Sequence, residues 1–158
     1  LDHPTADFDL HVLGDGGTPF THETDCYFSN KHPTPADCAA DAPQCSWVDD
    51  VEQNPSLDHD DNNGYGPENT NIVHPAPGSK WKIFVHYWAA NTDGAEDATA
   101  TLRVFCFGHQ AIEVTKTFPQ EQFMWQALDL KWPTEENDPC QLSQIGILES
   151  SPNPFGGT

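Results

Sequence analysis

The stretch KWKIFVHYW, residues 80–88, decides the fold of this chain because its apolar side chains recur at every second position. One face of the stretch carries Trp81, Ile83, Val85 and Tyr87. A side-chain period of two is typical of a β-strand, whereas a helix would repeat every three to four residues. We therefore predict a strand at 80–88 and expect it to be a central strand of a sheet.

The same alternation occurs in segments on both sides of this strand. DFDLHVL (7–13) places apolar side chains on one face and Asp7, Asp9 and His11 on the other, and ATATLRVFCF (98–107) predicts a second central strand. Further strands are expected at 110–118, 122–130 and 143–150, with turns at 91–97 and 107–110. No helical pattern separates these strands, which predicts an all-β fold, an antiparallel, jelly-roll-like β-sandwich.

The segment from 14 to 71 is long, polar and without regular alternation. Loops of this length are usually functional, or are held by something other than packing. A disulfide and a metal ion are the two candidates here. We predict a single domain, 1–158, with a loop-rich, acidic insertion at 14–71 and a linker-like tail at 150–158.

The charge balance narrows the choice of partners. The chain has 25 acidic and six basic residues and a formal net charge of -19, which disfavours nucleic acid and anionic membranes because both are negative. No apolar run approaches the roughly 18 residues that span a bilayer, so no membrane insertion is expected. The N-terminal residues lack a signal-peptide profile, which fits a processed or excised chain.

The five cysteines include no C-x-x-C pair, which favours disulfides over a zinc ribbon and an extracellular, cell-surface or periplasmic location. Cys38 and Cys45 bracket a short, turn-rich span, and Cys106 and Cys140 both lie in the C-terminal half. Pairing within each set leaves Cys26 over. A scheme in which Cys26 replaces any one of these four cysteines is equally allowed, so the disulfide connectivity stays open.

The loop LDHDDNNGYGPEN (57–69) concentrates oxygen ligands. Calcium takes six to eight oxygens from carboxylates, carboxamides, carbonyls and water. The candidates in the loop are Asp58, Asp60, Asp61, Asn63 and Glu68. The loop is not an EF-hand, because the glycine and the bidentate glutamate of that pattern are missing. Asp7 and Asp9, on one face of the 7–13 strand, are a second source of carboxylates. The alternative is a solvated acidic turn.

Five segments in this order, DFDLHVL, DCYFSN, NPSLDHDDNNGYGPENTNI, GSKWKIFVHYW and LRVFCFG, resemble an uncharacterised family of β-sandwich domains from secreted and surface proteins of Gram-negative bacteria. That family is similar to bacterial pre-peptidase C-terminal and collagen-binding-like domains. The resemblance implies a non-catalytic accessory module, often stabilised by calcium, that assists secretion, attachment or substrate binding. By position, it implies that Asp7, Asp9, Asp58, Asp60 and Glu68 bind the cation.

Eight histidines raise a metalloenzyme hypothesis, in which His11, His86 and either Asp9 or Glu68 bind zinc or iron. No H-E-x-x-H motif supports it. The alternative is that His11 and His86 hydrogen-bond to a loop carboxylate or carbonyl and so support the acidic loop from behind.

Aromatic residues offer a surface on which sugars stack. Trp88 and Trp132 lie at strand ends next to turn residues, so they are the candidates for exposure, together with Tyr65 in the acidic loop. Trp81 and Trp125 are expected in the core.

These patterns together predict a calcium-stabilised, non-catalytic module. Its partner would be an extracellular protein or a glycan, or further copies joined through cation-bridged acidic surfaces in an adhesin or filament. A carbohydrate-binding module that uses exposed tryptophans and a His/Asp metalloenzyme are the alternatives.

Overall fold

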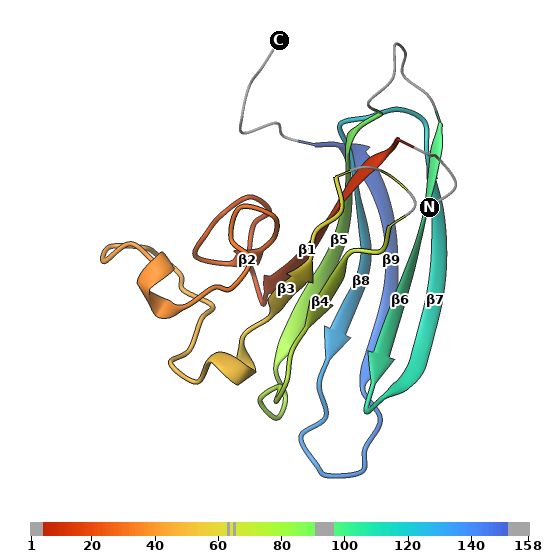
Figure 1. The fold of residues 1–158 in the computed structure, drawn as a ribbon. Coiled ribbons are helices and arrows are strands. Elements are labelled where there is room, and N and C mark those ends of the chain that lie inside the picture. The colour runs from red at the N-terminus through yellow and green to blue at the C-terminus, as the bar shows by residue number, and fades with distance from the viewer. Residues whose placement is uncertain (1–4, 63, 65, 91–96, 152–158) are drawn as a thin grey trace.

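The computed structural model describes residues 5–62, 64, 66–90 and 97–151, and the described part is all-β, as predicted, with antiparallel pairing throughout (Figure 1). The main sheet has the order β2-β1-β5-β8-β9 and contains β1 (Asp7–Gly14), β2 (Asp25–Cys26), β5 (Lys80–Ala89), β8 (Phe123–Lys131) and β9 (Gln141–Ser150). Two smaller sheets pair β3 (Ser56–His59) with β4 (Asn69–Asn71) and β6 (Ala98–Cys106) with β7 (His109–Phe118). Two 3-10 turns, η1 (Pro35–Asp37) and η2 (Val51–Gln53), lie in the loop-rich region.

The strand predicted from KWKIFVHYW is β5, and it is central, because β1 pairs with one of its edges and β8 with the other. Its alternating apolar side chains, Trp81, Ile83, Val85 and Tyr87, are all buried. Trp125 of β8 is buried as well, so both tryptophans expected in the core are there.

The β6–β7 ribbon forms a second layer over the main sheet (Figure 1). Ala100, Leu102 and Val104 of β6 belong to one hydrophobic cluster with Ile83 and Val85 of β5. The prediction that 98–107 is a central strand was wrong, because β6 pairs with β7 alone. Its outward face is exposed to solvent, which is why its sequence alternates between apolar and polar residues.

The turn predicted at 107–110 is confirmed as a tight β6–β7 hairpin. Cys106 pairs with His109, so the connection has two residues, Phe107 and Gly108, with φ of 53° and 77°. Two consecutive positive φ values are characteristic of the hairpin turn that matches the strand twist, and glycine takes this conformation without strain. Of the turn predicted at 91–97, only residue 97 lies within the described residues.

Both faces of β1 are covered, unlike the half-buried strand expected from its sequence. Phe8 and Val12 pack in the core, and the polar side chains on the opposite face are also buried, at 7%, 4% and 0% exposure for Asp7, Asp9 and His11. The segment that follows β1 covers this polar face, and the rings of Phe20 and Tyr27 contact His11 there.

Of the pairings that the sequence leaves open, the structure has the one within each set. Cys38 pairs with Cys45 inside the loop-rich region, and Cys106 at the end of β6 pairs with Cys140, just before β9. Cys26 is a free, buried thiol. Within the described part of the chain, no helix is long and apolar enough to cross a bilayer.

Candidate metal centre

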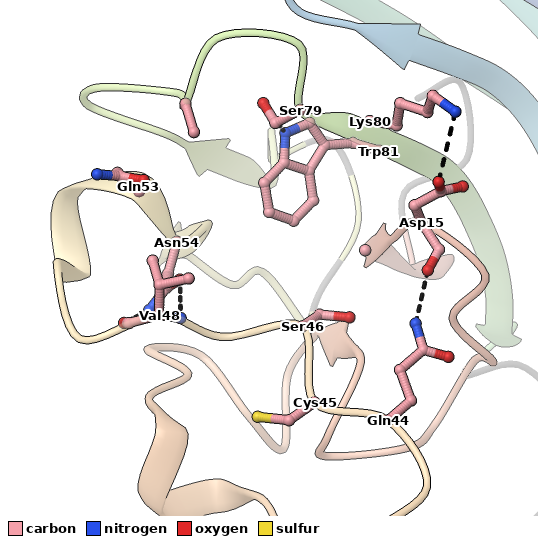
Figure 2. A pocket seen from close by; sticks show the side chains of 12 residues that line it. Asp15, Gln44, Cys45, Ser46, Val48, Gln53, Asn54, Ser79, Lys80 and Trp81 are labelled. Carbon is pink, nitrogen blue, oxygen red and sulfur yellow. Dashed lines mark hydrogen bonds and ion pairs between the residues drawn. The ribbon is translucent and has the colours of Figure 1, made fainter.

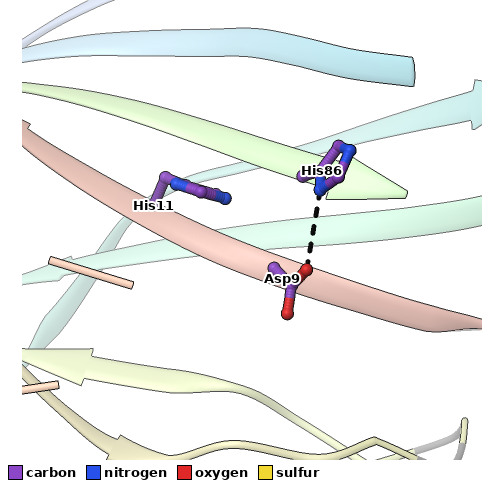
Figure 3. A group of neighbouring side chains, drawn as sticks. All are labelled: Asp9, His11 and His86. Atoms are coloured by element: carbon purple, nitrogen blue, oxygen red, sulfur yellow. Dashed lines mark ion pairs between the residues drawn. The ribbon is translucent and has the colours of Figure 1, made fainter. Parts of the chain in front are cut away.

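The register between β1 and β5 creates a cluster of polar side chains. Asp9 lies directly opposite His86. His11 lies opposite Phe84, which precedes His86 by two residues on β5. Residues opposite and diagonal to one another on adjacent strands share one face and lie close enough to touch. Figure 3 shows Asp9, His11 and His86 approaching one another from these two strands.

Asp9, His11 and His86 each offer one ligand atom, and these three atoms lie within 4.8 Å of one another. Both imidazoles are fully buried. His86 Nδ1 is 3.5 Å from Asp9 Oδ2, which is longer than an ordinary hydrogen bond. Within the described residues, neither nitrogen of His86 has a hydrogen-bond partner, and His11 Nε2 has none either. Buried polar atoms without partners destabilise a fold by about 1–3 kcal/mol each, so this cluster requires a physical explanation.

The other nitrogen of His11 is held firmly. His11 Nδ1 lies 2.6 Å from Asp25 Oδ2, and the Phe20 N–H donates to the same oxygen at 2.7 Å. Asp25 is placed by β2, where it pairs with Leu13 of β1. A carboxylate on Nδ1 favours the proton there and leaves the lone pair on Nε2, which faces the cluster. His11 therefore contacts a carboxylate, but that carboxylate lies on β2 and not in the acidic loop, and within the described residues His86 makes no hydrogen bond.

Aromatic rings enclose the two imidazoles. The ring of Phe20 lies 4.8 Å from that of His11 and 5.2 Å from that of His86, Tyr27 stacks on His11 at 5.3 Å, and Trp88 is 5.7 Å from His86. The cluster is therefore dry on this side. In such surroundings burial lowers the pKa of His86, against the opposing effect of Asp9, so the ring is neutral and retains a lone pair.

A second set of ligands adjoins the first and shares Asp9 with it. One carboxylate oxygen from each of Asp9, Asp60 and Glu68 lies within 4.8 Å of the others. Within the described residues, Asp9 Oδ2, Asp60 Oδ1 and Glu68 Oε1 are buried and make no hydrogen bond. The other oxygen of Glu68 accepts from the Leu10 N–H, and this contact fixes the loop to the edge of β1.

The carboxylates perturb one another. The pKa of Glu68 rises to about 9, chiefly because burial disfavours its charged form; the Leu10 hydrogen bond opposes this, and Asp9 and Asp60 reinforce it. Burial likewise raises the pKa of Asp7 to about 7, with contributions from Asp9, Asp60 and Asp61. The cation beside them is Lys31, whose Nζ lies 2.7 Å from Asp60 Oδ2. One lysine does not balance this group, which is therefore electrostatically suited to a divalent cation.

The glycines of the acidic loop explain its local path. Gly64 has φ of 65°, which a glycine adopts without strain. At Gly66, an added Cβ would lie 1.3 Å from Asp61 Oδ2, so only glycine lets this carboxylate lie against the backbone. The two glycines thus permit the compact loop that brings Asp60 and Glu68 together.

The remaining predicted site residues are elsewhere or outside the described residues. Asp58 is exposed on β3 and accepts a hydrogen bond from Ser56 Oγ at 2.7 Å, so it is not part of either set. Asn63 and Tyr65 lie outside the described residues. Asp25 and Lys31 were missed by sequence reasoning, because a two-residue strand and a lone lysine carry no periodic signal.

Trp88 and Trp132 do not share a surface. Trp88 is near the end of β5, whereas Trp132 follows Lys131, which pairs with Lys80 at the start of β5. At about 3.4 Å per residue, the length of β5 separates them by roughly 27 Å. Both are half-buried, and Trp132 packs on Phe107 with ring centres 4.6 Å apart. The two tryptophans therefore do not form one stacking platform.

The surface of the described residues has two hollows, and only the larger one is lined by residues of the cluster. A groove of about 970 Å³ lies between β4 and β6, over β1 and β5, and its lining includes Leu10, Ile72, Leu102 and Trp132. A smaller pocket, of about 270 Å³, lies beside Trp81 (Figure 2). There Asp15 is already paired, through its carboxylate with Lys80 and through its carbonyl with Gln44. The smaller pocket therefore has little capacity for a cation.

The chain was compared with known proteins and structures. No family model matches it, and no curated protein or solved structure is significantly similar to it.

Proposed function

We propose that this chain is a non-catalytic, calcium-stabilised binding or assembly module that works outside the cytoplasm. In this proposal a calcium ion joins β1 to the acidic loop through Asp9, Asp60 and Glu68. The observation that carries it is the convergence, within 4.8 Å, of one carboxylate oxygen from β1 and two from the acidic loop. All three side chains also have a buried oxygen without a hydrogen-bond partner among the described residues.

The chemistry of the set fits a hard cation. Calcium prefers oxygen ligands at about 2.3–2.6 Å and tolerates irregular geometry, so carboxylates from a strand and a loop suit it. The carboxyl group of Asp7 interacts with Asp9 and Asp60 of this group, and also with Asp61, so further negative charge lies close by. Bound calcium would remove the repulsion that otherwise favours protonation of Glu68, and it would fasten the loop to the edge of β1.

Two disulfides support a location in an oxidising compartment. The groove between β4 and β6 supplies a surface of mixed apolar and polar side chains for an extracellular protein or a glycan. The net charge of -19 supports self-assembly through bridging cations as a further role. The resemblance to secreted accessory domains agrees with each of these roles.

The test compares Asp60→Ala with Asp58→Ala. Both variants remove one carboxylate from the acidic loop, but only Asp60 belongs to the ligand set. With calcium at 100 times its Kd, the wild type should gain about 2.7 kcal/mol over its value in chelator. We expect Asp60→Ala to lose most of this gain and Asp58→Ala to keep it, as measured by urea unfolding. Equal calcium responses in the two variants would contradict the site.

A further inference from the structure

The proposed calcium site leaves the two buried histidines without a role. Calcium is a hard ion that binds oxygen, so it does not satisfy the nitrogens of His11 and His86. These side chains are fully buried, and His11 Nε2 and both nitrogens of His86 make no hydrogen bond within the described residues. A solvated surface role is excluded by their burial, and a packing role does not need two imidazoles beside a carboxylate.

We propose that His11, His86 and Asp9 form a second cation site, specific for a borderline divalent transition metal such as Zn²⁺, Fe²⁺ or Co²⁺. Two imidazoles and one carboxylate are a donor set that such ions accept. The proposal goes beyond the calcium module and stands without it, because its imidazole nitrogens are not calcium ligands and the two sets share Asp9 alone.

The separation of the donors supports this assignment. Two ligands of one tetrahedral zinc ion, each about 2.0–2.1 Å from the metal, lie roughly 3.3 Å apart. His86 Nδ1 and Asp9 Oδ2 are 3.5 Å apart, which is too long for a hydrogen bond and close to the separation of two ligands. All three ligand atoms lie within 4.8 Å, so a small movement of side chains closes the set.

The surroundings of the set resemble those of metal-bound histidines. His11 Nδ1 is hydrogen-bonded to Asp25, so Nε2 is the nitrogen that binds the ion, and Asp25 acts as a positioning residue. The Phe20 and Tyr27 rings lie beside the His11 ring and exclude water. Because both imidazoles are buried, the ion would have a structural role and would fasten β1 to β5 at Asp9 and His86.

Asp9 belongs to both sets. A carboxylate has two oxygens, so Asp9 can bridge the transition metal and the calcium ion. The two ions together supply four positive charges. The region contains four carboxyl groups, and the side chain of Lys31 is paired with one of them; the carboxyl groups are those of Asp7, Asp9, Asp60 and Glu68. The bridge gives a physical reason for the position of Asp9 between the histidines and the loop.

The test is equilibrium dialysis of the whole chain against Zn²⁺ in saturating calcium, followed by elemental analysis. The wild type should hold one zinc ion per chain at the tight site. His86→Gln should weaken this binding at least tenfold, and Asp25→Asn should weaken it while leaving some binding. His109→Gln is the matched control because His109 is exposed on β7, and it should bind zinc as the wild type does. Zinc binding that is the same in His86→Gln as in the wild type overturns the proposal.

A readout on the unmodified protein guards against variants that fail to fold. In ¹⁵N-histidine-labelled protein, Zn²⁺ should shift His11 Nε2 and one nitrogen of His86, and should leave His11 Nδ1 protonated. Shifts confined to the exposed histidines overturn the proposal. Asp60→Ala separates the two sites, because it should lose most of the calcium response and leave zinc binding in place.

Discussion

Substitution of Glu68 by glutamine should change the stability of this protein in opposite directions with and without calcium. Glu68 is a ligand in the proposed site, and its buried carboxyl has a pKa of about 9 instead of the ordinary 4.5. Glutamine keeps an oxygen that can accept from the Leu10 N–H, but it carries no charge. It therefore mimics the protonated carboxyl and removes a calcium ligand.

The size of the effect follows from proton linkage. A folded-state pKa raised above the unfolded value contributes stability that is fully present below about pH 4.5 and is lost as the pH rises through about 9. At pH 7 the unfolded chain has an ionised Glu68 and the calcium-free fold a protonated one. The interval from 4.5 to 7 corresponds to a destabilisation of at most about 3 kcal/mol. Glu68→Gln avoids this penalty.

The assay is urea unfolding at pH 5, 7 and 9, in chelator and in saturating calcium. In chelator the wild type should lose stability from pH 5 to pH 9, and Glu68→Gln should be more stable than the wild type at pH 7 by roughly 1–3 kcal/mol. In calcium the order should reverse, because the variant lacks a charged ligand. A variant that is destabilised equally in both conditions would refute the reasoning.

Three further predictions concern the cysteines. Replacement of Cys106 and Cys140 by alanine should lower the free energy of unfolding by about 4 kcal/mol, because their disulfide closes a loop with a sequence separation of 34; urea unfolding measures it. The same change at Cys38 and Cys45, with a separation of 7, should lower it by about 2 kcal/mol, and a larger loss here than at the first pair would contradict the loop-entropy estimate. Burial raises the pKa of the Cys26 thiol to about 12, so Cys26 should react with a thiol reagent at pH 8 only when urea unfolds the chain; rapid labelling of the native protein would show that it is accessible.

The sequence predicts individual strands better than it predicts their neighbours. Alternation identified β1 and β5 nearly to the residue, because each has one face in the core. The same signal could not show that β6 pairs with β7 alone, since alternation reports which face is buried and not how many neighbours a strand has. Alternation also could not show that the segment after β1 covers the polar face of that strand.

The candidate site was predictable where its residues are local and unpredictable where it depends on register. Asp60 and Glu68 stand out through carboxylate density around two glycines, and the structure brings both to Asp9. Asp58 belongs to the same run, but the alternation of β3 turns it outward while Leu57 turns inward. The position of His86 opposite Asp9 required the β1–β5 register, which a single sequence does not contain.

The most direct test of the central claim is thermal unfolding of the wild type in excess chelator, and then with calcium, magnesium or zinc added back. Elemental analysis of the untreated protein accompanies it. Calcium should raise the unfolding temperature by several degrees and magnesium should not, and the untreated protein should contain calcium in near-stoichiometric amount. An unfolding temperature that no added metal changes, in protein that contains no calcium, would contradict the account and make the loop at 57–69 a solvated acidic turn.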